Sequence, residues 1–344
     1  MPRPDRFLKA CKLELPDCTP IWLMRQAGRY MEEYRRLRER YTFMEMCQTP
    51  ELALEVTLQP IRRFDLDAAI IFSDILLPLE KMGVAVHFGD AGGPALEKPV
   101  RSRRDVEALR PVEPEEEMSY VLKAVEMVRQ ELAGAAPLIG FSGAPFTLAS
   151  YLIEGGGSKH FLSTKAFMYG EPDAFNLLME KLTVMAASYL NAQIRHGAQA
   201  VQIFDSWAGV LSAPDYEHYI MGHMTRLFAS LDRSVPSIHF GADTCHLLPL
   251  MKEAGGDVIG VDWRLPINDA WELIGRDRAI QGNLDPAALF SPAGRLTRQA
   301  GEVLRRAAGA PGHIFNLGHG VLPGTPVEAV ELLVRTVHEY GGTP

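Results

Sequence analysis

Two arginines stand four residues apart where an early apolar run ends. The stretch PIWLMRQAGRY, residues 20–30, places Arg25 and Arg29 directly after a run typical of a buried strand, with Gly28 between them. A guanidinium is a permanently charged planar fork that suits a carboxylate, and a glycine allows backbone amides to approach the same anion. The spacing predicts a site for an anionic ligand. The alternative is that both arginines cap a helix or pair with the glutamates that follow.

Other polar groups follow later apolar runs in the same way. Asp74 follows a run that ends at residue 72, Ser206 follows one that ends at residue 204, and His319 stands between two glycines after the last run. No lysine follows any of these runs, and the sequence contains no P-loop, nucleophile elbow, HExxH motif or zinc-type cluster of Cys and His. Arginines, an aspartate and a histidine bind carboxylates and steer protons. The pattern therefore indicates chemistry on an anionic ligand rather than hydride transfer, phosphoryl transfer or a Schiff base.

Eight short apolar runs alternate with stretches of helical periodicity, and these elements must position the polar groups. The runs lie at residues 20–24, 68–72, 137–141, 200–204, 236–240, 258–261, 278–281 and 313–316. They are rich in Ile and Val and show little strict alternation, as in strands buried on both faces of a parallel sheet. Eight strands, each followed by helical sequence, predict an α/β protein with a single (β/α)₈ TIM-type barrel over residues 1–344, enlarged by insertions in the early βα loops.

The alternative architecture is a doubly wound open sheet. That fold would need a glycine-rich phosphate loop after an early strand, and no GxGxxG spacing occurs. In a barrel, by contrast, active sites lie where the strands end. The polar residues that follow the runs are then expected on one rim.

Proline and glycine mark the predicted helix ends. Thr-Pro pairs at residues 49–50 and 325–326 are typical of a capping threonine followed by proline in the first turn. The second pair has a glutamate three residues after its threonine, which predicts a capping box. Glycine pairs at residues 255–256 and 341–342 predict helix ends.

The composition is that of an ordinary globular protein and narrows the partners. Of 344 residues, 47% are hydrophobic and 23% are charged. A formal net charge of -8 argues against nucleic acid as the main partner, and no run approaches the roughly 18 apolar residues of a membrane helix. The start of the chain lacks an apolar signal segment, so a cytoplasmic location is predicted. The four cysteines are predicted to be reduced thiols.

Several motifs together resemble the uroporphyrinogen decarboxylase family of haem biosynthesis. They are MRQAGRY, FSDIL, GAPFTL with YLIEGGG, QGNLDP and NLGHG, in this order over essentially the whole chain. The resemblance implies a (β/α)₈ barrel, a homodimer and decarboxylation with no metal or other cofactor. The substrate that it implies is uroporphyrinogen III, whose four acetate side chains become methyl groups to give coproporphyrinogen III.

The resemblance also implies which residues act. Asp74, Arg25 and Arg29 are the implied catalytic residues. The implied substrate-binding residues are Arg25, Gln26, Ala27, Gly28, Arg29, Arg38, Asp74, Tyr151, Ser206 and His319. The arginines would meet the eight carboxylates of the substrate. Tyr151 would donate a hydrogen bond to a substrate carboxylate or to Asp74. Ser206 would bind a carboxylate. His319 would bind a propionate or relay a proton.

A carboxylate such as that of Asp74 repels a polyanion unless it meets hydrogen-bond donors. The four pyrrole N–H groups of a tetrapyrrole are such donors. Protonation of a pyrrole carbon makes the ring cationic, and the ring then accepts the electrons that CO₂ loss leaves behind. Asp74 would stabilise that positive charge. The alternative role is an N-cap of the next segment. The proton donor stays open between an arginine, water and a substrate carboxyl, since a guanidinium is a poor acid.

Two other functions stay open on the sequence. A corrinoid or thiol methyltransferase of the same superfamily would bind zinc through a His-x-Cys pair and a later cysteine. Here IHFGAD has His239 but Gly241 in place of the cysteine, and no cysteine follows Cys245. A non-catalytic tetrapyrrole carrier would need the arginines but not Asp74.

Overall fold

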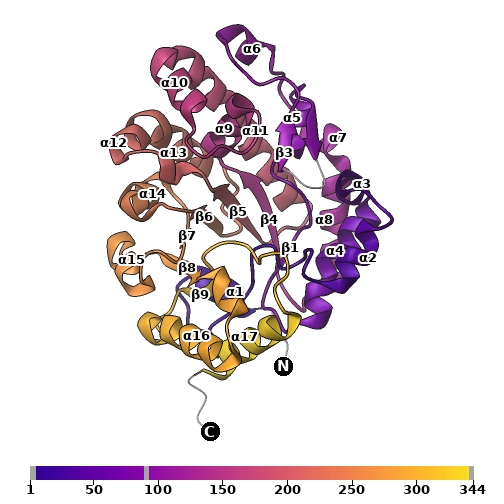
Figure 1. Cartoon of the computed structure of the whole chain (residues 1–344), viewed down its shortest axis with the longest axis vertical. Coiled ribbons are helices and arrows are strands. Elements are labelled where there is room, and N and C mark those ends of the chain that lie inside the picture. Colours follow the sequence, from indigo (N-terminus) through magenta and orange to yellow (C-terminus); the bar gives the residue numbers. More distant parts are fainter. Residues whose placement is uncertain (1–4, 89–92, 341–344) are drawn as a thin grey trace.

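A barrel of parallel strands forms the centre of the molecule, and helices surround it (Figure 1). The computed structural model describes residues 5–88 and 93–340. Within those residues the main sheet has seven strands, hydrogen-bonded in chain order and each parallel to the next. The strands are β1 (Ala69–Ile70), β4 (Leu138–Gly143), β5 (Ala200–Asp205), β6 (Ser237–Gly241), β7 (Val258–Gly260), β8 (Ala279–Leu284) and β9 (His313–Leu317). Each lies within two or three residues of a predicted run.

The predicted first strand, residues 20–24, is an extended segment rather than a regular strand. One parallel bridge joins Ile21 to Phe315 of β9, and the Phe315 N–H donates to the Pro20 carbonyl over 2.8 Å. On the other side, the Ile21 carbonyl accepts from the N–H of Asp67, just before β1, also over 2.8 Å. The segment therefore lies between the last and the first regular strands and closes the sheet. The predicted TIM-type barrel is confirmed, with one irregular strand position.

Buried polar side chains explain why this segment has no regular ladder. The Leu23 N–H donates to Oε1 of Gln26 over 3.2 Å, and the Met24 N–H donates to Oδ1 of Asn316 over 3.1 Å. Gln26 and Asn316 are themselves buried. Because buried backbone N–H groups must be paired, these side chains replace neighbouring strand carbonyls. The chain is then free to turn directly after Met24.

Helices follow the strands on the outside of the barrel. The longer ones are α4 (Pro50–Arg63), α8 (Ser119–Leu132), α9 (Pro145–Glu154), α10 (Leu162–Gly170), α11 (Pro172–Arg195), α13 (Gly222–Ala229), α15 (Ile267–Ile274), α16 (Ala293–Ala307) and α17 (Val327–Glu339). Shorter helices are α1 (Asp5–Cys11), α2 (Glu32–Arg38), α3 (Phe43–Gln48), α5 (Leu77–Lys81), α6 (Arg103–Ala108), α7 (Pro114–Glu117), α12 (Ala213–Asp215) and α14 (Leu248–Ala254).

The predicted insertions fall early in the chain. Helices α2 and α3 precede α4, and a longer insertion separates β1 from α8. It contains α5, α6, α7 and an antiparallel hairpin of β2 (Val86–Phe88) and β3 (Pro94–Leu96). The sequence pattern does not predict this hairpin, because strands of three residues are too short to show a periodicity.

Helix α1 covers the N-terminal ends of the strands. Its Phe7 and Ala10 are fully buried in one apolar cluster with Ile139 of β4, Ile238 of β6 and Ile314 of β9. These isoleucines are each the second residue of a strand. An apolar plug therefore fills this end of the barrel. Polar residues are left to gather at the carboxyl ends.

The predicted helix signals are partly wrong. Thr49 is at the N-cap position of α4 with proline in the first turn, as expected, but its side chain makes no capping hydrogen bond, and Gly255 is at the C-cap position of α14. At 325–328, however, the residue flanking α17 is Pro326, and the Thr325 hydroxyl donates to the Leu322 carbonyl over 2.8 Å instead of capping. The predicted capping box there does not form. The glycine pair at 341–342 lies outside the described residues.

Candidate active site

Arg25 is the centre of the polar rim. Its backbone has a positive φ of 59°, in the left-handed region that side chains rarely adopt. This conformation turns the chain out of the closing segment. A β-carbon at Gly320 would lie 2.4 Å from Cδ and 2.6 Å from Cγ of Arg25, so the arginine stem lies directly on that glycine. One of the two glycines beside His319 is therefore needed to make room for Arg25.

Gln26 holds this turn. Its side-chain amide donates to the Ala68 carbonyl over 3.2 Å, while Oε1 accepts from Leu23. Its N–H donates to the Leu23 carbonyl, and its carbonyl accepts from the Tyr30 hydroxyl over 2.6 Å. Each polar group of Gln26 thus has a partner inside the protein. The structure gives Gln26 a supporting position beneath Arg25, while the neighbouring Ala27 and Gly28 are half-buried.

Asp74 follows β1 and is partly buried. Its Oδ1 accepts from the Leu76 N–H over 2.9 Å, which fixes the carboxylate in a local turn. Among residues 5–88 and 93–340, no protein donor bonds its second oxygen. Burial raises the pKa of Asp74 to about 6. The hydrogen bond from the Leu76 N–H and the Arg25 charge act in the opposite direction and lower this pKa. The helix that follows, α5, has Leu76 at its N-cap position, so Asp74 is not that N-cap.

Tyr151 lies on α9 and faces the end of β5. Its ring stacks on that of Trp207, with centroids 4.0 Å apart and an interplanar angle of 32°. Burial first, and the Asp74 charge second, raise the pKa of Tyr151 to about 12. The phenol therefore keeps its proton at neutral pH and acts as a donor. Ser206, half-buried, lies between the last residue of β5 and Trp207.

His319 is a neutral donor in this site. Its Nδ1 accepts from the Gly320 N–H over 2.7 Å, which assigns the proton of a neutral ring to Nε2. Burial, and then the Arg25 charge, lower the pKa of His319 to about 4. Near pH 7 the ring therefore offers Nε2–H to a ligand and carries no positive charge.

The two other predicted arginines lie in the segment that follows Arg25 along the chain. Arg29 is exposed, and its carbonyl accepts from the Arg35 guanidinium over 3.0 Å. Arg38 on α2 donates to the Tyr41 carbonyl over 2.7 Å. Burial raises the pKa of the Cys47 thiol well above its usual value; the Asp74 charge raises it further, and the Arg38 charge lowers it.

Two side chains of the rim were not predicted. Trp207 comes directly after Ser206, and Arg264 comes two residues after Asp262, which itself directly follows the run 258–261. Arg264 donates to Asp262 over 2.5 Å, and its charge also lowers the pKa of His319. The sequence signal for both was their nearness to a predicted strand end. Whether each of these side chains reaches the rim depends on the direction in which its loop turns.

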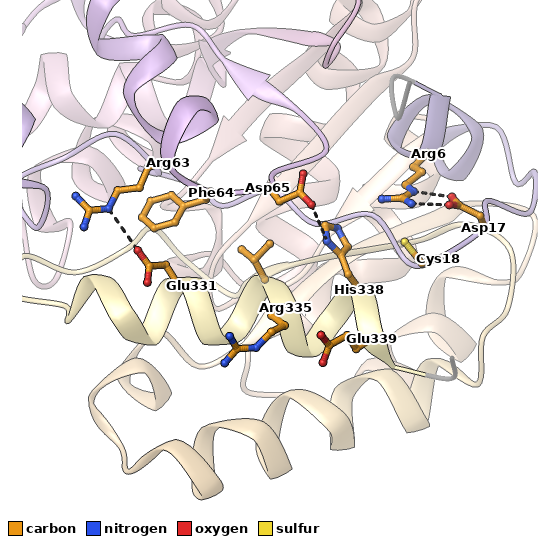
Figure 2. Close-up of a pocket in the computed structure, with 11 residues that line it drawn as sticks. Arg6, Asp17, Cys18, Arg63, Phe64, Asp65, Glu331, Arg335, His338 and Glu339 are labelled. Carbon is orange, nitrogen blue, oxygen red and sulfur yellow. Dashed lines mark hydrogen bonds and ion pairs between the residues drawn. The ribbon is translucent and has the colours of Figure 1, made fainter. Parts of the chain in front are cut away.

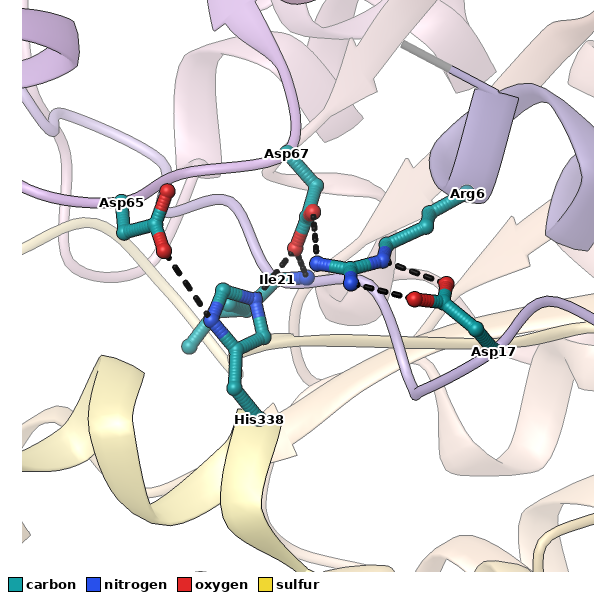
Figure 3. Close-up of polar contacts among 6 residues, drawn as sticks. All are labelled: Arg6, Asp17, Ile21, Asp65, Asp67 and His338. Atoms are coloured by element: carbon teal, nitrogen blue, oxygen red, sulfur yellow. Dashed lines mark hydrogen bonds and ion pairs between the residues drawn. The ribbon is translucent and has the colours of Figure 1, made fainter. Parts of the chain in front are cut away.

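A cavity of about 540 Å³ lies away from this rim (Figure 2). Several of its charged side chains are paired, among them Arg63 with Glu331. Arg6 binds Asp17 and Asp67, and His338 of α17 contacts Asp67 over 2.7 Å (Figure 3). The ion pairs link α1, the start of β1 and α17. None of the predicted site residues lines the cavity, so we assign these charges to support of the barrel.

His239 is not part of the rim either. Its neighbour Phe240 lies in the interior cluster of the barrel, and alternation along β6 directs His239 to the opposite face. There its ring packs against Phe228 of α13, with centroids 5.1 Å apart. No group of three His, Cys, Asp or Glu side chains suited to a metal ion occurs in the part of the chain that the structure describes. A zinc site of the methyltransferase kind has no counterpart at this position.

The barrel fold and the polar rim place this chain in the class of enzymes that bind their substrates at the carboxyl ends of barrel strands. A sequence model of uroporphyrinogen decarboxylase (URO-D) matches residues 2–340, and the chain belongs to this family. The uroporphyrinogen decarboxylase of Carboxydothermus hydrogenoformans is 54% identical over 97% of this chain and 96% of its own. That of Sorangium cellulosum is also 54% identical, over 97% and 96%.

A solved structure supports the fold. A methyltransferase from Methanosarcina mazei has a TM-score of 0.80 to this chain at 19% identity, and the match covers 99% of both chains. At that identity the likeness shows the shared barrel alone. Among the described residues, no helix combines the length and apolar character that crossing a membrane requires.

Proposed function

We propose that this chain removes the four acetate carboxyl groups of uroporphyrinogen III as CO₂ and so forms coproporphyrinogen III. It is a decarboxylase of porphyrin and haem biosynthesis, because it belongs to the uroporphyrinogen decarboxylase family over residues 2–340. That whole-length match, at 54% identity to relatives named for this activity, is the observation that carries the proposal. The geometry of the rim supports it, because cationic and neutral donors surround one carboxylate.

Arginines provide the anchoring charges. In this proposal Arg25, Arg29 and Arg38 bind substrate carboxylates, and Tyr151, Ser206 and His319 donate single hydrogen bonds. Tyr151 and His319 suit this role because their shifted pKa values keep an O–H and an N–H in place at neutral pH. Charge-assisted hydrogen bonds contribute about 1.5–3 kcal/mol each, so several of them orient the macrocycle.

Asp74 acts at the centre of the macrocycle. Its free oxygen accepts from pyrrole N–H groups. A proton added to a pyrrole carbon makes the ring cationic, and the C–C bond to the acetate carboxylate then breaks toward the ring and releases CO₂. A second proton adds to the exocyclic carbon as the ring proton leaves, so each cycle consumes one proton per CO₂. A fixed carboxylate beside the cationic ring lowers the barrier to this step.

Asp74 is also the group of this site whose pKa lies nearest to neutrality. A pKa of about 6 suits proton exchange near physiological pH. A guanidinium does not, because it is a poor acid that keeps its proton near neutral pH. The first proton comes from a substrate carboxyl group, from water or from one of these side chains.

Turnover without added metal or cofactor tests the proposal. Purified protein is incubated anaerobically with reduced uroporphyrinogen III, and the oxidised porphyrins are separated by carboxyl number. Stepwise appearance of species with seven, six, five and four carboxyl groups is the expected result. Intact substrate recovered from folded protein would refute it. An Asp74→Asn variant that still binds substrate but loses turnover would exclude the carrier role, whereas one that turns over normally would remove Asp74 from the mechanism.

We further propose that residues 1–344 act as one catalytic domain within a homodimer. Support for this comes from the family resemblance. Light scattering coupled to gel filtration tests it, with a mass twice that of one chain as the expected result.

A further inference from the structure

A buried threonine on α9 makes two contacts toward the end of β5. The Thr147 hydroxyl donates to Oδ1 of Asp205 over 3.3 Å and accepts from the Trp207 N–H, also over 3.3 Å. Thr147 and Asp205 are both fully buried. The two bonds fix the backbone on either side of Ser206. One hydroxyl group on α9 therefore links the two residues that flank Ser206.

The same helix meets Trp207 a second time. Tyr151 is one helical turn after Thr147, so both side chains project from one face of α9. The Tyr151 ring stacks on Trp207 at 4.0 Å, and the Phe161 ring meets the indole edge at 5.0 Å. Trp207 is thus held by its N–H at Thr147 and by its ring at Tyr151. These contacts set the spacing between Tyr151 and Ser206.

Asp205 is an unfavourable residue for stability alone. Its Oδ2 has no hydrogen-bond donor among residues 5–88 and 93–340, and the nearest nitrogen of His239 is 3.8 Å away. A buried carboxylate with one long hydrogen bond costs free energy that an apolar residue would not. The fold by itself gives no reason for this group. Its one bond leads to Thr147 and from there to the active site.

We infer that Thr147 and Asp205 are positioning residues: they set the distance between Tyr151 and Ser206 without touching substrate. The inference rests on the proposed function, because it takes Tyr151 and Ser206 as ligands of two substrate carboxylates. Asp205 orients the Thr147 hydroxyl, the hydroxyl holds the Trp207 backbone, and the indole holds the Tyr151 ring.

A pair of Thr147 substitutions tests the inference. Thr147→Val keeps the shape of the side chain and removes both bonds, whereas Thr147→Ser keeps the hydroxyl. Two long hydrogen bonds are lost, one to a carboxylate and one from a backbone N–H, so we expect Thr147→Val to raise KM for uroporphyrinogen III about tenfold, with kcat changed less than about threefold. Thr147→Ser should restore KM to within about threefold of the parent value. This split follows because the misplaced groups bind substrate and do not react.

A second buried threonine provides the control. The Thr183 hydroxyl on α11 donates to the Met179 carbonyl over 2.7 Å, within its own helix. Thr183→Val should therefore leave both kinetic constants unchanged. If Thr147→Val lowers the unfolding midpoint but leaves KM unchanged, the hydroxyl serves packing only and the inference is refuted. An equal rise of KM in Thr147→Val and Thr147→Ser would refute it as well.

Two further measurements keep the test decisive. If Thr147→Val does not fold, Asp205→Asn takes its place, because an amide of the same shape removes the charge and alters the bond to the threonine. It should raise KM in the same direction, and an unchanged KM refutes the inference. Wild-type turnover is measured first. Its absence would overturn the proposed function, whereas normal wild-type turnover with unchanged variants overturns this inference alone.

Discussion

Replacing Asp74 by asparagine is expected to abolish turnover and, at the same time, to make the protein more stable. The carboxylate lies partly buried, and burial raises the pKa of Asp74 to about 6 from an ordinary 3.8. A raised pKa for an acid means that the folded state favours the protonated form. The ionised carboxylate therefore destabilises the fold at neutral pH. Asparagine resembles the neutral form and retains an oxygen for the Leu76 N–H.

The size of the gain follows from the two pKa values. Each pH unit between them is worth about 1.4 kcal/mol, so the full difference is about 3 kcal/mol. Asp74 is in part accessible to water, which screens its charge, and we expect a gain of about 1–3 kcal/mol. Below about pH 4 Asp74 is neutral in both the folded and the unfolded state, so the gain vanishes. It develops between about pH 4 and 6 and is complete above pH 6.

Urea unfolding of both proteins at pH 4, 6 and 8 measures this difference. Asp285→Asn is a matched control, because Oδ1 of Asp285 accepts from the Ala287 N–H over 2.9 Å in the same kind of turn. It shows what the change of a turn acceptor does by itself. Should Asp74→Asn be less stable than the parent protein at pH 8, the Arg25 charge outweighs burial and the reasoning fails.

Three other substitutions test the packing around the rim and at the opposite end of the barrel. Gly320→Ala places a β-carbon 2.4 Å from Cδ of Arg25, so it should displace the guanidinium and lower kcat/KM on the order of a hundredfold. Gly222 has open space around it, so the control variant Gly222→Ala should leave kcat/KM unchanged. Asp67→Ala removes the partner of Arg6, of His338 and of the Ile21 N–H, and urea unfolding should show a loss of about 3–5 kcal/mol; a loss below 1 kcal/mol would contradict the supporting role. Phe7→Ala opens the apolar plug of α1, and a calorimetric scan should show a lower Tm that corresponds to about 3–5 kcal/mol.

The sequence by itself determined the class of fold and most members of the rim. Seven of its eight apolar runs are regular strands, because a strand buried on both faces must be continuously apolar whatever its neighbours are. The polar residues at the strand ends could be selected for a related reason: parallel strands end at one edge, so Asp74, Ser206 and His319 had to lie on the same side. The substitutions proposed above test the roles predicted for these residues.

The tertiary structure decided what depends on distant partners. Residues 20–24 are not a regular strand because Asn316, almost 300 positions later, supplies an acceptor to Met24. Arg25 needs a glycine at position 320, and the stack of Tyr151 on Trp207 joins α9 to the turn after β5. The neutral state of His319 comes from burial and the Arg25 charge. Local patterns record burial and turn chemistry, whereas these contacts exist only once the barrel has closed and brought its first and last strands together.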